Sequence, residues 1–235
     1  MAKGEFRNAA RDQSSLLAPL EKRALLWMAH RMPAWVGSDQ LTLLGFAGML
    51  ATGVTYWLAR YNPYALAAGI ATLALNWFGD SLDGTLARVR NRQRPRYGFY
   101  VDHITDSIGT SALLGGMAYS TLMSEWVGLT LLIAFLLMSI QSYLATYTLG
   151  TFQLSFWKFS PTELRVLLIA GNIAVLLRGP LAHLAGRTFL LFDVGGVAGI
   201  VGMTVMLLVS SVRNTIALYR LEPLDLPAGP ESARR

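Results

Sequence analysis

The feature that most constrains the fold of this chain is a series of long apolar stretches without a charged residue. Four of these stretches run for 18 or 19 residues, and a helix needs roughly 20 residues to cross a bilayer. Only 14% of the residues are charged, against roughly 25% in an ordinary soluble domain. A soluble globular fold and a disordered chain are therefore excluded. The sequence predicts an all-α integral membrane protein, with spans drawn from Leu41–Ala59, Tyr61–Gly79, Ser107–Ser124, Trp126–Trp157, Val166–Leu177 and Val194–Val212.

The placement of basic residues predicts how six such helices are oriented. If the N-terminus is cytoplasmic, 17 of the 20 Lys and Arg residues lie on the inner face. Because cytoplasmic loops carry an excess of Lys and Arg, we expect both termini to be cytoplasmic and the chain to lie in the cytoplasmic membrane of a bacterium. Membrane topology and anionic lipid headgroups account for the net charge of +6, so no nucleic-acid partner is expected.

Three regions are predicted along the chain. Residues 1–36 form a cytoplasmic N-terminal segment, in which Pro19–Val36 mixes apolar and charged residues in a way typical of an amphipathic helix at the inner membrane interface. An ordinary surface helix is the alternative for that stretch. Residues 37–220 form the domain of six transmembrane helices, and residues 221–235 form a Pro- and charge-rich tail that we expect to be disordered.

Some predicted helices continue beyond their apolar stretch. The second begins near Tyr64 and its pattern continues through Arg90, and the third begins near Gly98, before its apolar part. The fourth takes about the first 24 residues of the longest stretch, which leaves Thr151–Phe159 as an aromatic connection at the interface. The fifth is predicted to start at Pro161, because proline is favoured at the first position of a helix.

Four aspartates lie at the predicted cytoplasmic ends of the second and third membrane helices. Asp80 and Asp83 share one helix face, as do Asp102 and Asp106, and a short turn allows the two faces to meet. Carboxylates gathered at a membrane edge repel one another and are costly to desolvate, so the cluster needs a cation. With no cysteine in the chain and no clustered histidine, these oxygen donors favour Mg²⁺, Mn²⁺ or Ca²⁺.

Such a cluster suits chemistry on a diphosphate. Two divalent ions about 3.5–4 Å apart could bridge a diphosphate and stabilise a displacement at phosphorus. A carboxylate outside the metal shell could act as general base for an alcohol. Gly84 follows Asp83 directly and, because it has no side chain, would let a ligand approach the helix backbone closely.

The same segment follows a known pattern. It reads Asp80-Ser-Leu-Asp83-Gly84-Thr-Leu-Ala87-Arg88, nine residues, Gly98, three residues, Asp102, three residues, Asp106. This resembles the signature of the CDP-alcohol phosphotransferase (CDP-alcohol phosphatidyltransferase) family, written D-x2-D-G-x2-A-R, about eight residues, G-x3-D-x3-D. All eight signature residues are present, and the spacer has nine residues in place of about eight. The resemblance covers approximately residues 33–220.

The resemblance implies an active site at the cytoplasmic membrane face. It implies two divalent cations, Mg²⁺ or Mn²⁺, held by Asp80, Asp83, Asp102 and Asp106, with Asp106 also the catalytic base. It further implies nucleotide and diphosphate contacts from Asp80, Asp83, Gly84, Ala87, Arg88 and Gly98.

The reaction that the resemblance implies is attack by an alcohol hydroxyl on the phosphorus bonded to the lipid alcohol, with CMP leaving. The leading expectation is transfer of a phosphatidyl group from CDP-diacylglycerol to a small polar alcohol. A CDP-linked small alcohol of the choline or ethanolamine type, with a lipid acceptor, is the alternative within the family. Because members are commonly homodimers, a homodimer is also expected. A cation transporter or channel is the rival from another class, since acids within a membrane also mark ion pathways.

Other polar residues carry less specific expectations. The segment Pro161-Thr-Glu163-Leu-Arg165 resembles the Pro-Thr-Glu segment at the start of the fifth span in several family members. Glu163 and Arg165 either contact the acceptor or anchor the helix at the interface. His103 is expected to face a neighbouring helix. Asn76 is expected to pair between helices, with a hydrogen bond to the site as the alternative. The inner-loop arginines serve topology and lipid attraction, or alternatively bind a phosphate; they are Arg90, Arg92, Arg94 and Arg96. A face of small residues in the sixth span is expected to pack within the molecule, with a dimer contact as the alternative; it comprises Gly195, Gly199 and Gly202.

Overall fold

The structure is a computed structural model that describes residues 18–150, 161–184 and 186–223. Within these residues the chain forms seven α-helices and one antiparallel two-stranded hairpin. The elements are α1 (Ala18–Arg31), α2 (Ser38–Leu58), α3 (Ala65–Val89), α4 (Pro95–Ala118), α5 (Glu125–Leu149), α6 (Pro161–Arg178), β1 (Leu181–Leu184), β2 (Arg187–Leu190) and α7 (Leu191–Leu221).

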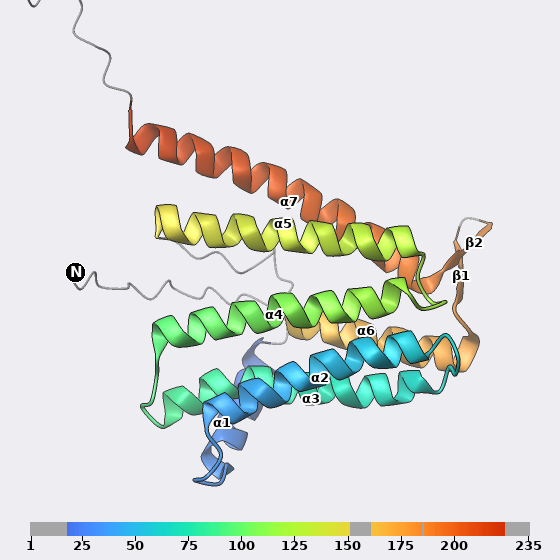
Figure 1. Cartoon of the computed structure of the whole chain (residues 1–235), viewed down its shortest axis with the longest axis horizontal. Helices are drawn as coiled ribbons and strands as arrows, with labels where there is room; N and C mark the ends of the chain where they lie inside the picture. The colour runs from blue at the N-terminus through green and yellow to red at the C-terminus, as the bar shows by residue number, and fades with distance from the viewer. Residues whose placement is uncertain (1–17, 151–160, 185, 224–235) are drawn as a thin grey trace, which may run out of the picture.

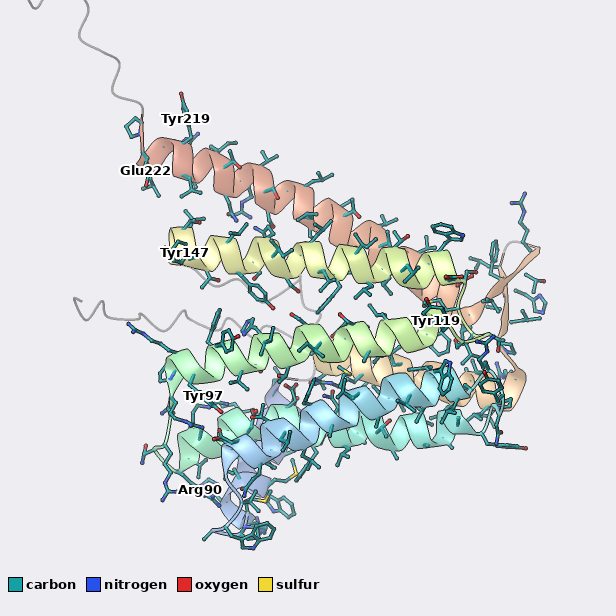
Figure 2. The ribbon with its side chains drawn as sticks, viewed as in Figure 1. Arg90, Tyr97, Tyr119, Tyr147, Tyr219 and Glu222 are labelled. Carbon is teal, nitrogen blue, oxygen red and sulfur yellow. The ribbon has the colours of Figure 1, made fainter. Side chains whose placement is uncertain are left out.

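The helices α2 to α7 run alongside one another as a bundle, and α1 lies at a steep angle across one end (Figure 1). Figure 2 shows Arg90, Tyr97, Tyr147 and Tyr219 at that same end and Tyr119 at the opposite end. The turn between α3 and α4 therefore shares one end of the bundle with the C-terminal ends of α5 and α7. We call this the Arg90 end.

Most predicted helix boundaries are close to those of the structure. Helix α3 continues to Val89 and α6 begins at Pro161, as expected, and α4 begins at Pro95, three residues before the predicted start. The hairpin between α6 and α7 is not predicted from the sequence. The predicted connection Thr151–Phe159, residues 1–17 and residues 224–235 of the tail lie outside the described residues.

Among the described residues, three helices are long and apolar enough to cross a membrane, judged by length and composition. They are Ser38–Ala59, Glu125–Leu149 and Leu191–Leu221. Helix α6 has 18 residues, three of which are charged, and this charge content is too high for the same criterion of length and composition. The count of six spans and the position of α1 along the membrane interface therefore stay predictions.

Helix α2 packs against α3 and α4 with almost no side chain between the backbones. A Cβ atom on Gly45 would lie 2.8 Å from the backbone nitrogen of Asp80, and one on Gly48 would lie 2.8 Å from that of Asn76. A Cβ atom on Gly53 would lie 2.6 Å from the carbonyl carbon of Ala112 in α4. Small residues allow helices to approach this closely. The part of α3 that carries Asp80 is thus held by direct backbone contact with α2.

Helix α1 packs on the Arg90 end of α3. Leu25 and Ala29 are buried against Leu82 and Leu86, in a cluster that also contains Leu41 of α2. At the end of α3, the Arg90 guanidinium donates hydrogen bonds to backbone carbonyls in the segment between α1 and α2, namely those of Met32, Pro33 and Val36. Apolar packing and these bonds fix α1 against the helix that carries Asp80.

The glycines of α7 divide between two faces. A Cβ atom on Gly196 would lie 2.6 Å from Val127 of α5, and one on Gly199 would lie 3.1 Å from Leu131. Gly195 and Gly202 have no such neighbour within 4 Å among the described residues. The expected packing within the molecule is therefore found for Gly199 and not for Gly195 or Gly202, because residues seven apart share a face that points away from α5.

Candidate metal and active site

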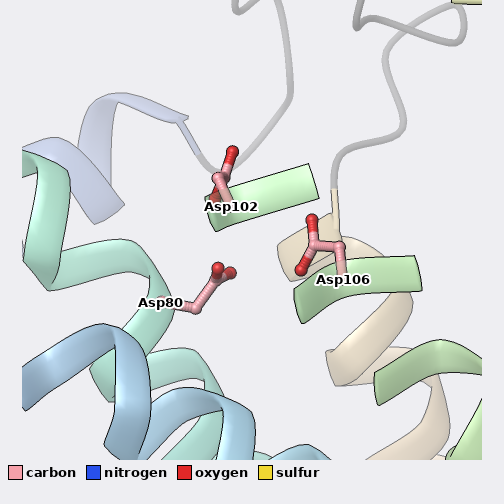
Figure 3. A group of neighbouring side chains, drawn as sticks. All are labelled: Asp80, Asp102 and Asp106. Atoms are coloured by element: carbon pink, nitrogen blue, oxygen red, sulfur yellow. The ribbon is translucent and has the colours of Figure 1, made fainter. Parts of the chain in front are cut away.

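Three of the four predicted aspartates converge between α3 and α4. Asp80, Asp102 and Asp106 each offer a carboxylate oxygen, and these oxygens all lie within 4.8 Å of one another. Figure 3 shows the three side chains turned toward one another from the two helices. Each residue is partly buried. The expected meeting of the two helix faces is therefore present in the structure.

The donor set fits a hard divalent cation. Metal–oxygen distances of about 2.0–2.6 Å put oxygens on opposite sides of one ion roughly 4–5 Å apart, which the spacing of the three carboxylates matches. All three donors are carboxylate oxygens, the ligand type that Mg²⁺, Mn²⁺ and Ca²⁺ prefer. The geometry is compatible with a metal ion and does not distinguish among these three.

Asp83 lies outside the group of three. One carboxylate oxygen, Oδ2, accepts a hydrogen bond of 2.5 Å from Thr42 Oγ1 in α2, and the other accepts one from the backbone nitrogen of Gly84. Both oxygens thus already have donors in this arrangement. The role of Asp83 as a metal ligand stays a prediction.

Arg165 of α6 binds one of the three carboxylates, a contact that is not predicted from the sequence. Its buried guanidinium donates from Nη2 to Asp80 Oδ2 at 2.5 Å and from Nε to Asn76 Oδ1 at 2.7 Å. Asn76 in turn donates to the backbone carbonyl of Gly45 at 2.9 Å. Asn76 therefore pairs between helices as expected and also holds Arg165. A lone arginine near the start of an apolar helix, which must find a carboxylate partner, is the signal that points to such a pair.

Glu163 is buried, like Arg165, in the first part of α6. Because Arg165 contacts Asp80, the start of α6 lies next to the carboxylates, and Glu163 is buried in this same part of the helix. Arg165 is thus held on Asp80 inside the bundle. Contact of either residue with an acceptor stays a proposal.

The remaining signature residues lie around the Arg90 end. Arg88 is exposed and donates to Thr85 Oγ1 at 3.0 Å, and a Cβ atom on Gly84 would lie 3.5 Å from its guanidinium. Ala87 is partly buried. Gly98 is exposed, and a Cβ atom there would meet no described atom within 4 Å. The structure thus leaves Arg88 and Gly98 accessible to a ligand.

Two arginines of the inner loop have partners within the chain. Arg94 forms an ion pair with Asp39 in the first turn of α2, and its guanidinium lies 4.0 Å from the centre of the Tyr97 ring. Arg90 binds backbone carbonyls, as described above. Besides the predicted roles in topology, lipid attraction or phosphate binding, these two arginines therefore also hold neighbouring segments of the chain together.

His103 faces a neighbouring helix, as expected. Its ring stacks on that of Phe99, with centroids 4.1 Å apart, and meets the edge of Tyr143 in α5 at 5.1 Å. Its Nδ1 atom also lies 3.6 Å from Asp102 Oδ2. His103 therefore links the site-bearing face of α4 to α5.

A comparison with protein families gives the class of protein. The model of the CDP-alcohol phosphatidyltransferase family matches residues 35–216. The matched range contains the complete signature, the three converging carboxylates and the Asp80–Arg165 pair. Members of this family use divalent metal ions, which agrees with the donor set. The cation transporter has no support in this match.

The matched family consists of membrane-embedded transferases of phospholipid synthesis that act on a CDP-alcohol donor and an alcohol acceptor. The match confirms the family resemblance that the signature carries. The chain therefore belongs to the CDP-alcohol phosphatidyltransferase family and is a membrane transferase.

Proposed function

We propose that this chain transfers a phosphatidyl group from CDP-diacylglycerol to the hydroxyl of a small polar alcohol and releases CMP. The observation that carries the proposal is the convergence of Asp80, Asp102 and Asp106 within 4.8 Å of one another. The two helices that bring them together also carry all eight residues of the family signature.

In this proposal all four aspartates are metal ligands, and one of them is also the base. Two divalent cations, Mg²⁺ or Mn²⁺, are held by Asp80, Asp83, Asp102 and Asp106. When bound, such ions neutralise the diphosphate and stabilise the negative charge that develops at phosphorus. Each carboxylate oxygen of Asp83 accepts one hydrogen bond and has a further lone pair, so Asp83 can bind a cation while it keeps its bonds to Thr42 and Gly84.

Asp106 acts as the base. It accepts the proton of the acceptor hydroxyl as that oxygen attacks the phosphorus bonded to the lipid alcohol. A new bond forms between the acceptor oxygen and phosphorus, and the bond from phosphorus to the bridging diphosphate oxygen breaks. CMP leaves with that electron pair. The products are a phosphatidyl alcohol and CMP.

The signature residues at the Arg90 end bind the nucleotide part of the donor. The exposed Arg88 guanidinium pairs with a phosphate oxygen, because arginine forms charge-assisted hydrogen bonds to phosphate. Gly84, Ala87 and Gly98 provide surface on which the cytidine and diphosphate approach the helix backbones closely. The open surroundings of Gly98 support this assignment.

The start of α6 lies on the acceptor side. Arg165 orients Asp80, and the buried Glu163 contacts the polar alcohol.

The Arg90 end and both termini face the cytoplasm of a bacterium, with residues 37–220 as the six-helix membrane domain. The chain functions as a homodimer in this proposal.

The proposal is tested by CMP release from the purified protein. CDP-diacylglycerol or CDP-choline is supplied with Mg²⁺ or Mn²⁺ and an acceptor panel of inositol, inositol phosphate, glycerol phosphate, serine, choline and ethanolamine; diacylglycerol accompanies CDP-choline. We expect release from CDP-diacylglycerol that requires one of these alcohols and stops when the metal is chelated. Release only from CDP-choline with diacylglycerol would support the alternative within the family. No release from either donor would overturn both assignments.

A further inference from the structure

Glu21, in the first turn of α1, is bound by two other helices. Its Oε1 atom accepts hydrogen bonds from Trp77 Nε1 at 2.9 Å, Ser81 Oγ at 3.3 Å and Thr162 Oγ1 at 2.7 Å. Trp77 and Ser81 belong to α3, whereas Thr162 lies in the first turn of α6. One carboxylate oxygen thus joins three helices.

The donors to Glu21 lie beside the residues that form the candidate site. Ser81 follows Asp80 directly, and Trp77 lies almost one turn before it. Thr162 precedes Arg165 by three residues, and Arg165 donates to Asp80 Oδ2 at 2.5 Å. Glu21 therefore connects the two helix segments whose separation determines whether Arg165 reaches Asp80.

The chemistry of a carboxylate suits this position. An ionised carboxylate only accepts hydrogen bonds, so it can serve several donors at once, and its charge strengthens each bond. Glu21 also lies at the N-terminal end of α6, where the positive end of the helix dipole favours a negative charge. The surroundings of Glu21 thus favour a glutamate over a neutral side chain of the same length.

The rest of α1 is held independently of Glu21. Leu25 and Ala29 are buried against α3, and Arg90 binds the segment that follows α1. Replacing Glu21 therefore removes a local connection between α3 and α6 and leaves the main packing of α1 in place.

We propose that Glu21 is a positioning residue that holds the start of α6 against α3, so that Arg165 keeps Asp80 turned toward Asp102 and Asp106. It acts on the reaction through Arg165 and Asp80 and does not touch the substrate. The inference rests on the proposed function for its activity measurements, and metal binding provides a measurement that does not depend on that function.

The experiment compares Glu21→Ala, Glu21→Gln and Thr162→Val with the full-length chain in detergent or lipid nanodiscs. Two quantities are measured, namely kcat and KM for CMP release and the Kd for Mn²⁺ from electron paramagnetic resonance. Residues that orient metal ligands typically change metal affinity or activity by about 10- to 100-fold. We expect Glu21→Ala to lower kcat and weaken Mn²⁺ binding by about 10-fold, with KM for the donor little changed.

Two comparisons separate positioning from general stability. Glu21→Gln keeps an acceptor oxygen, so it should retain more activity and tighter Mn²⁺ binding than Glu21→Ala. The double variant Glu21→Ala/Thr162→Val should be hardly worse than the more impaired single variant, because both remove the same bond. Lys22→Ala, an exposed neighbour on α1, is the control and should match the unaltered chain.

The outcomes distinguish this inference from the proposed function. Unaltered kcat and Mn²⁺ affinity in Glu21→Ala, or additive effects in the double variant, would overturn the role of Glu21 and leave the proposed function intact. If the unaltered chain releases no CMP from any donor, the proposed function fails, and the Mn²⁺ titrations still decide the role of Glu21. If Glu21→Ala does not fold, Glu21→Gln and Thr162→Val, singly and together, give the same test.

Discussion

Helix α2, which packs on α3 and α4, differs from the pair α5 and α7 in how much of it is buried against other helices. Glycines bring the backbone of α2 against those of α3 and α4, and 39% of the most apolar stretch of α2 is buried. The corresponding share in α5 and in α7 is 11%, and both helices are more apolar than α2. The three carboxylates that converge belong to the closely packed group.

The difference between the two regions follows from what each has to do. Carboxylates from two helices meet within 4.8 Å only if the helix axes are held at a fixed separation, and backbone contact through glycine gives such a separation. Helix α7 exposes a row of apolar side chains instead, including Val201, Val205 and Leu208, which suits hydrocarbon around it. Substitutions should therefore have large effects in the first region and small effects in the second.

The largest effect is expected from Asp106→Asn in the closely packed group. The amide cannot take the proton of the acceptor, so kcat should fall by about 10²- to 10⁴-fold. Binding of the donor should largely persist, because the change leaves the volume of the side chain almost the same. Steady-state CMP release and donor binding measure the two quantities. Unchanged turnover would remove Asp106 from the role of base.

A smaller loss is expected from Arg165→Lys. Lysine keeps the positive charge but cannot bind Asp80 and Asn76 at once through a planar guanidinium. We expect kcat and Mn²⁺ affinity to fall by about 10- to 100-fold. The control is Arg178→Lys at the other end of α6. Equal Mn²⁺ affinity in Arg165→Lys and the unaltered chain would show that the pair with Asp80 does not affect the metal site.

Gly45→Ala against Gly195→Ala tests the comparison directly. The added methyl group at Gly45 lies 2.8 Å from the backbone nitrogen of Asp80, so α2 and α3 must separate, whereas at Gly195 it meets nothing described within 4 Å. We expect Gly45→Ala to lose about 1–3 kcal/mol of stability, together with activity. Gly195→Ala should match the unaltered chain in a thermal unfolding measurement. Equal Tm values for the two variants would contradict the difference between the regions.

The smallest effect is expected from Val201→Ala on the outward face of α7. This side chain is 57% exposed, so its truncation should change the free energy of unfolding by no more than about 0.5 kcal/mol. Thermal unfolding and size-exclusion chromatography are measured on the same sample. A large loss of stability together with a change in apparent mass would show that this face packs against a second copy of the chain.

Helix positions and the meeting of the carboxylates could be predicted because both depend on local spacing. Apolar stretches determine the helices, and aspartates three or four residues apart share a face whatever else the helix contacts. A lone arginine near the start of α6 indicates that a carboxylate partner exists. That the partner is Asp80 could not be predicted, because the two residues are 85 apart and their spacing carries no periodic signal. The hairpin of β1 and β2 could not be predicted for a related reason, since its short strands lie in a connection that contains no long apolar pattern.

The hydrogen bond between Glu21 and Thr162 has a consequence for the order in which the chain assembles. The two residues are 141 positions apart, so this bond cannot form until the ribosome has made the start of α6. Helix α1 emerges first, yet its contact surface on α3 and its bond to α6 are both made later. Helix α1 can pack on α3 before α6 exists, so its packing and its bond to α6 form at different stages, and the candidate site is complete only after α6 has joined α3.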